Sequence, residues 1–163
     1  MQIARILFLL AISLFWLGAC ALHPFSAISP GMTREEVIAR VGQPGAVVAI
    51  PQGTRLQYSG QPTGQFAFMV DLDAGGRVLS ARQVLNARDF ARIEAGKWTR
   101  DDVLREFGRP ALVDRVASWP GDVLTYRWYD LQDLFYWVYL DVNQVVQRAH
   151  PGMEFRNDPN DRD

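Results

Sequence analysis

The chain has 163 residues, 48% of them hydrophobic, and its 17 basic and 18 acidic side chains leave a formal net charge of −1. This balance excludes a basic nucleic-acid-binding protein and an acidic disordered tail. One cysteine and two histidines are too few for a structural zinc site, and a single cysteine cannot form an intrachain disulfide. We therefore expect a folded module with an aromatic-rich core and with no metal or cofactor.

Residues 1–19 have the pattern of a secretion signal. A basic start is followed by an apolar run from Ile6 to Ala19, which is shorter than the roughly 20 residues of a membrane-spanning helix. The run ends in Leu-Gly-Ala-Cys at 17–20, which resembles the lipobox of bacterial lipoproteins. There the chain is cut before a cysteine whose thiol then carries acyl chains. We expect lipidation of Cys20; the alternative is an ordinary signal peptide with an incidental cysteine.

A lipidated Cys20 would make residues 20–23 a tether at a membrane surface, because each buried CH₂ of an acyl chain contributes about 0.8 kcal/mol. Ala21 stands where, in many Gram-negative lipoproteins, an aspartate signals retention in the inner membrane. The resemblance therefore implies the periplasmic face of the outer membrane, with its lipid as the first partner. A chain with no other cysteine suits that oxidising compartment.

The remainder of the chain contains one unit twice, at residues 24–85 and 89–152, followed by a loose tail at 153–163. The two units share glycine, threonine, proline, tyrosine and aspartate positions in the same order. The aligned segments are 31–33 with 96–99, 41–44 with 107–110, 56–58 with 124–126, and 70–73 with 138–141. A repeat of this length predicts two copies of one fold.

Each unit begins with signals for short helices. Thr33 with Glu36, and Thr99 with Asp102, have the spacing of a capping box, in which the threonine and the acidic residue bond each other's backbone amides. A glycine and a proline then end the helix. A shorter apolar pair before each threonine predicts one more helical turn, so each unit should start with a helix pair.

Strand-like runs follow the helices in both units. They span residues 47–50, 55–59, 65–73 and 77–84 in the first unit, and 112–116, 123–129, 134–142 and 144–149 in the second. Short turns between them favour antiparallel meanders with helices on one face. The predicted fold class is α+β, with two tandem αα-βββ units, each a short helix pair packed on an antiparallel meander sheet.

The pattern Gly-Met-Thr with a later Val, Gly and Pro, at residues 31–44, resembles the signature of the BamE, SmpA and OmlA family of small lipoproteins. That family implies a lipid-anchored domain attached to the machinery that assembles outer-membrane β-barrels. Its members have one unit, whereas this chain has two. The tandem arrangement resembles that of the β-lactamase inhibitor protein, where two units form a concave sheet that grips an enzyme.

Aromatic residues concentrate in the second unit. Carrying the register of the first unit across the repeat places Leu134, Tyr136, Val138 and Leu140 in the core. Phe135, Trp137 and Tyr139 then lie on the opposite face, as a candidate protein-binding patch. The alternative is that these rings pack against the other unit, the tail or the 117–121 connection. Arg127 and Tyr129 share this face only if no bulge intervenes.

Two functions therefore remain open. The first is a non-catalytic outer-membrane lipoprotein that acts as an accessory or scaffold in β-barrel protein assembly and envelope integrity, with subunits of the assembly machinery as partners. The second is a periplasmic protein-binding or inhibitor module that uses the aromatic face. We expect no enzymatic activity and no nucleic-acid or small-molecule substrate, because the sequence has no phosphate loop, metal-ligand spacing or nucleophile elbow.

Overall fold

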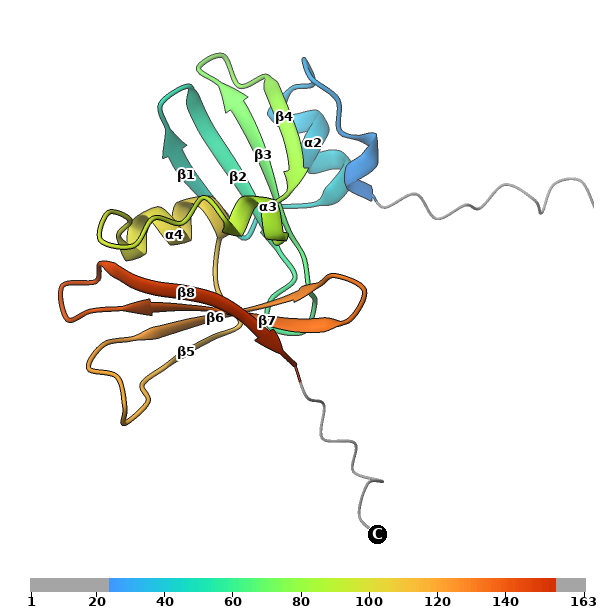
Figure 1. Ribbon diagram of the computed structural model, residues 1–163. Helices are drawn as coiled ribbons and strands as arrows, with labels where there is room; N and C mark the ends of the chain where they lie inside the picture. Colours follow the sequence, from blue (N-terminus) through green and yellow to red (C-terminus); the bar gives the residue numbers. More distant parts are fainter. Residues whose placement is uncertain (1–23, 155–163) are drawn as a thin grey trace, which may run out of the picture.

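The computed structural model describes residues 24–154, so the predicted signal, Cys20, the tether and most of the predicted tail lie outside the described residues. Two four-stranded antiparallel sheets, each preceded by short helices, build this part of the chain (Figure 1). The α+β class is confirmed. Within residues 24–154, no helix has both the length and the apolar character needed to cross a membrane.

Both units run from short helices into a meander sheet. The first comprises η2 (Pro24–Ala27, a 3₁₀ turn), α2 (Arg34–Val41), β1 (Ala46–Ile50), β2 (Gly53–Ser59), β3 (Ala67–Asp73) and β4 (Val78–Gln83). The second comprises α3 (Ala87–Phe90), α4 (Arg100–Phe107), β5 (Leu112–Asp114), β6 (Val123–Tyr129), β7 (Asp133–Leu140) and β8 (Val146–Met153). The spatial orders are β1-β2-β3-β4 and β5-β6-β7-β8.

The predicted αα-βββ arrangement is corrected in two respects. Each sheet has four strands, because the run after the last hairpin turn pairs along its length with the strand before it. The first helix of the first unit is only a 3₁₀ turn. The antiparallel meander itself is as expected.

Both main helices begin at the predicted capping boxes. The Thr33 amide donates to Glu36 Oε2 at 2.8 Å, and the Glu36 amide donates to Thr33 Oγ1 at 3.2 Å. Thr99 and Asp102 form the same pair of bonds at the start of α4. These bonds satisfy backbone amides that lack partners in the first helical turn.

The repeated tyrosines connect each sheet to the end of its helix. Tyr58 donates its hydroxyl to the carbonyl of Gly42 at 3.1 Å, and Tyr126 donates to that of Gly108 at 2.9 Å. Both glycines have positive φ, 87° and 74°, which a residue with a Cβ adopts only at a cost. Burial raises the pKa of both tyrosines, so the donors stay protonated.

One face of the first sheet is closed by α2 of the same unit. Val37 of α2 is fully buried and belongs to one cluster with Leu56 of β2 and with Val70 and Leu72 of β3. Ile28, from the segment before α2, joins the same cluster. This unit therefore has its own small core.

The other face of the first sheet is closed by α4 of the second unit, which lies between the two sheets in Figure 1. Ala67 and Met69 of β3 are fully buried in one cluster with Val103 and Phe107 of α4. The cluster continues into the second sheet through Leu124, Tyr126, Val138 and Leu140. The two units thus share a core, whereas the sequence predicted helices on one face of each sheet only.

Two polar side chains of β2 hold the C-terminal end of α4. Arg55 donates to the carbonyl of Arg105 at 3.0 Å and forms a bidentate pair with Asp71, at 2.6 and 2.9 Å. It also lies 3.0 Å from Glu106 Oε1. Gln57 donates to the carbonyls of Leu104 and Arg105. Burial opposes the charge of Arg55, but the carboxylates of Asp71 and Glu106 hold its pKa above the ordinary value.

A loop of the first unit also extends the second sheet. The Gln61 amide group donates to the Arg127 carbonyl at 2.7 Å and accepts from the Arg127 amide at 3.1 Å. β5 pairs with β6 only from Val123 to Thr125, so at Arg127 the Gln61 side chain takes the place of a neighbouring strand. Gln65 adds bonds to the Trp128 carbonyl and to Asp133. The helix and this loop together fix the second sheet against the first unit.

Replacing Arg55 will test how much the contact between β2 and α4 stabilises the fold. Arg55→Ala leaves Asp71 as a poorly solvated carboxylate without its ion pair and removes one of the pairs of Glu106, so we expect the free energy of unfolding to fall by about 3 kcal/mol. Urea denaturation at neutral pH measures it. Lys97→Ala is the control, because its pair with Glu94 is exposed and screened by solvent, so its loss should change stability little. Equal losses in the two variants would contradict the assigned role.

Acid should weaken the segment that joins the two units. Burial alone would raise the pKa of Asp89, but hydrogen bonds from Asn86 and Arg82 outweigh it and lower the pKa below its ordinary value. Because the pKa of this carboxylate is lower in the folded state than in the unfolded state, its charge stabilises the fold at pH values above the unfolded-state pKa. This contribution is lost as the pH falls through the folded-state pKa. We expect unfolding free energies to decline below about pH 4. Asp89→Asn should flatten that decline in a pH series of urea denaturations; an unchanged slope would contradict it.

Candidate functional site

Alternate residues of β7 point to opposite faces of the second sheet. The core-facing residues are Leu134, Tyr136, Val138 and Leu140, all in or against the shared core. Phe135, Trp137 and Tyr139 lie on the outer face and are half-buried. The register carried over from the first unit is therefore confirmed for both faces, while a binding role for the three aromatics stays a prediction.

The neighbouring strands add to the same face. β6 pairs with β7 without a register shift from Tyr129 to Val123, so Arg127 and Tyr129 do share the side of Phe135. The facing residues of β8 are Arg148, His150 and Gly152, which pair with Tyr139, Trp137 and Phe135. We call these six residues of β7 and β8 the outer aromatic face.

The Trp137 ring lies against the backbone of Gly152. A Cβ at this glycine would come within 2.1 Å of the Trp137 ring, so only glycine leaves room for the indole. The ring also makes an edge contact with His150, at 5.4 Å between centroids, and lies 5.8 Å from Phe135. Packing on its own sheet therefore sets the orientation of Trp137.

Tyr139 is the more covered end of the face. Arg148 lies over its ring at 4.0 Å from the centroid, and His150 stacks beside it at 5.5 Å. Trp119, from the 117–121 connection, meets Tyr139 edge-on at 5.3 Å and donates its Nε1–H to the Leu140 carbonyl. The alternative that the rings pack against this connection is thus correct for Tyr139, while the ring contacts given above for Phe135 and Trp137 stay within the sheet.

The cations on this side of the sheet differ in their pairing. Arg127 is bound to Glu154, with a closest distance of 2.6 Å, and also donates to the carbonyls of Pro62 and Thr63. Arg148 is exposed and forms no ion pair with any residue in the 24–154 range. Its guanidinium rests on aromatic rings and keeps donors free for a carboxylate from elsewhere.

The end of β6 and the turn after it carry two exposed hydrophobic residues whose exposure was not predicted from the sequence. Tyr129 is 62% exposed and Leu131 is 92% exposed. Leu131 also has φ 61°, in the left-handed region that a leucine rarely adopts. Tyr129 lies on the side of Phe135, and the side chains of both Tyr129 and Leu131 are exposed, so these residues extend the candidate surface beyond Phe135.

Among residues 24–154, no group of three or more His, Cys, Asp or Glu side chains is placed to hold a metal ion. The candidate site therefore consists of the outer aromatic face, including the guanidinium of Arg148, which is unpaired within this range, and the hydrophobic β6–β7 turn beside it. Such a surface can bind another macromolecule by burying its rings and by pairing its charge.

The fold and the site define a two-sheet α+β protein with one open aromatic sheet face. No family model matches the chain, and no curated protein matches it. Among solved structures, the chain is similar to YjgB, a DUF4309 family protein from Bacillus subtilis, with 15% identity and a TM-score of 0.32 over 75% of this chain and 78% of that one. A likeness at this level carries no argument about function.

The expected membership of the BamE, SmpA and OmlA family is therefore wrong, and so is the resemblance to the β-lactamase inhibitor protein. The matched residues explain the error. Thr33 caps a helix, Gly42 ends it, and the later aspartates bond turn amides, as Asp73 does with Arg77. Such residues are common at the ends of helices and in turns of many folds, so they describe local structure rather than descent.

The turn residue Leu131 gives a direct test of its conformational cost. Leu131→Asn places a residue that tolerates positive φ in the turn, so we expect the free energy of unfolding to rise by about 1 kcal/mol. Leu79→Asn is the matched control, because Leu79 is 45% exposed on strand β4. Urea denaturation compares the two. If Leu131→Asn stabilises no more than the control, the conformation of Leu131 has no cost.

Proposed function

We propose that the protein is a lipid-anchored, non-catalytic binding module of the bacterial envelope. It is held through Cys20 at the periplasmic side of the outer membrane and captures a partner protein on its outer aromatic face. The supporting observation is an asymmetry among the sheet faces. Within residues 24–154, α2 and α4 cover three of the four faces, and the face with three aromatic rings has no helix over it (Figure 1).

The composition of this face suits a protein partner. Trp, Tyr and Arg are the residues that contribute most to protein interfaces, because they bury a large area and keep a polar group for hydrogen bonds. Trp137 is held by Gly152, and Tyr139 by Arg148, so little side-chain entropy is lost on binding. The partner should offer a carboxylate to Arg148 and an apolar side chain to Phe135 and Trp137.

An accessory or scaffold role in outer-membrane β-barrel assembly stays a prediction. It followed from the family resemblance, which is now corrected, so the proposal itself names no complex. In-cell photo-crosslinking from position 137 of the full-length protein tests both, with position 79 of β4 as the control surface. Assembly-machinery subunits crosslinked from 137 and not from 79 would support the scaffold role. A single other periplasmic protein would support the binding module, and equal or absent capture at both positions would overturn the proposal.

The partner identified in this way allows a quantitative test. Trp137→Ala should weaken its binding by about 2 kcal/mol, roughly 30-fold in Kd, because a central interface aromatic is lost. Leu79→Ala, the control, should leave Kd unchanged. Binding is measured by titration calorimetry with the full-length protein, and thermal unfolding verifies that each variant is folded.

Gly152→Ala separates the position of the ring from its presence. The new methyl group meets the outer atoms of the Trp137 ring, which must move, while every aromatic side chain remains. We expect a loss of affinity of the same sign as for Trp137→Ala and a shift of the Trp137 indole resonance in NMR spectra. A moved indole with unchanged affinity would show that the partner binds elsewhere.

A further inference from the structure

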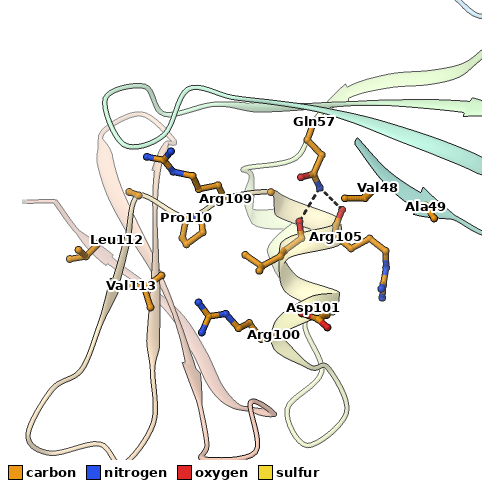
Figure 2. A pocket seen from close by; sticks show the side chains of 13 residues that line it. Val48, Ala49, Gln57, Arg100, Asp101, Arg105, Arg109, Pro110, Leu112 and Val113 are labelled. Atoms are coloured by element: carbon orange, nitrogen blue, oxygen red, sulfur yellow. Dashed lines mark hydrogen bonds between the residues drawn. The ribbon is translucent and has the colours of Figure 1, made fainter. Parts of the chain in front are cut away.

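A second concave surface lies where the two units meet. A cleft of about 760 Å³ opens between β1 of the first sheet and β5 of the second, with α4 along its floor. Figure 2 shows Val48 and Ala49 on one side, Leu112 and Val113 on the other, and the helix between them. The cleft shares no residue with the outer aromatic face.

The walls of the cleft are mainly apolar. Its apolar lining residues are Val48, Ala49, Leu104, Pro110, Ala111, Leu112 and Val113. Val113 pairs with Leu124 on the α4 side of the second sheet and is 44% exposed, so a hydrophobic surface faces solvent here. An exposed apolar surface inside a concave site is typical of ligand or peptide binding.

The edge of β1 is unusual among the sheet edges of residues 24–154. The segment before α2 hydrogen-bonds Val78 of β4, the segment before α4 hydrogen-bonds Val146 of β8, and β5 is short and carries Asp114. By contrast β1 reads Ala-Val-Val-Ala-Ile, with no charge and no proline, and no strand lies beside its outer edge in the described part of the chain. Proteins normally protect such an edge because it can pair with another strand.

The arginines of the cleft differ in their pairing, and the one that is unpaired within the described chain lies at the C-terminal end of α4. Arg100 is bound to Asp122 and Gln144, and Arg105 is bound to Asp102. Arg109, just beyond the C-terminal end of α4, is exposed and forms no hydrogen bond or ion pair with any described residue. In Figure 2 its guanidinium is at the opposite end of the cleft from the start of the helix.

We propose that this cleft is a peptide-binding site, in which an extended apolar segment of a partner adds as a strand to the free edge of β1 and places a carboxylate on Arg109. Backbone bonds to β1 would supply affinity, and the apolar walls would select alternate side chains. β1 has five residues, so its edge pairs with a strand of about the same length. The occupant is therefore a short strand of β-branched residues that ends in an acidic side chain.

The test uses the full-length protein in detergent micelles and a capped fluorescent peptide, Val-Thr-Val-Thr-Val-Glu. A peptide with Lys in place of Glu controls for partition into micelles. We expect saturable binding of the Glu peptide, with a Kd at least 5-fold lower than that of the Lys peptide, because only the Glu peptide can pair with Arg109. This ratio corresponds to roughly 1 kcal/mol. Arg109→Ala should remove that preference, and Val113→Glu should weaken both peptides, because Val113 pairs with Leu124 and lies on the α4 side of β5. Both residues are exposed, and Leu79→Glu is the control for an added charge elsewhere.

Each outcome decides the proposal. Amide shifts in NMR spectra confined to β1, β5 and the end of α4 would support it. No saturable binding up to about 1 mM, or binding that is indifferent to both Arg109→Ala and Val113→Glu, would overturn it. A dimer in light scattering that Val113→Glu dissociates would also overturn it, because a second copy of the chain would then occupy the cleft.

Discussion

The C-terminal end of α4 is held by the first sheet, and the arrangement of the whole molecule depends on that contact. The last carbonyl groups of a helix have no partners within it. Here the side chains of Arg55 and Gln57 on β2 donate hydrogen bonds to these carbonyl groups. Both residues are buried, with only 5% and 6% of their surface exposed. Cationic charge at this end of a helix is favourable as well. Because α4 also carries the core of the second sheet, fixing its end fixes one sheet against the other.

Both candidate surfaces follow from the position of α4. The helix covers the inner side of the second sheet, so the alternate residues of β7 are left on the outside. It also separates β1 from β5, which leaves a groove above its exposed side rather than a continuous sheet (Figure 2). One helix thus determines which surface is core, which is open and where the two units leave a cleft.

The sequence was informative wherever contacts are short-range. Thr33 and Glu36 cap a helix three residues apart, and the alternation of Phe135 to Tyr139 follows from the strand itself, so both were predicted from spacing. Contacts across the chain were not predicted. The bonds from Gln57 to Leu104 and from Gln61 to Arg127 join residues 47 and 66 positions apart, and neither pair has a pattern in the sequence. The role of α4 and the cleft depend on such contacts.

The difference between the two repeats gives the reason to regard the open face as functional. In the first unit the positions equivalent to Phe135, Trp137 and Tyr139 are Ala67, Met69 and Asp71. Ala67 and Met69 are buried under α4, and Asp71 is paired with Arg55. The second unit has no third helix over it within residues 24–154, so its equivalent face meets solvent. Stacked repeat proteins normally make their terminal surface polar, because an apolar one attracts other chains. This terminal surface has instead become more aromatic than its buried counterpart. Packing within the described chain leaves Phe135, Trp137 and Tyr139 only half-buried, and this remaining surface is what the proposed capture of a partner would use.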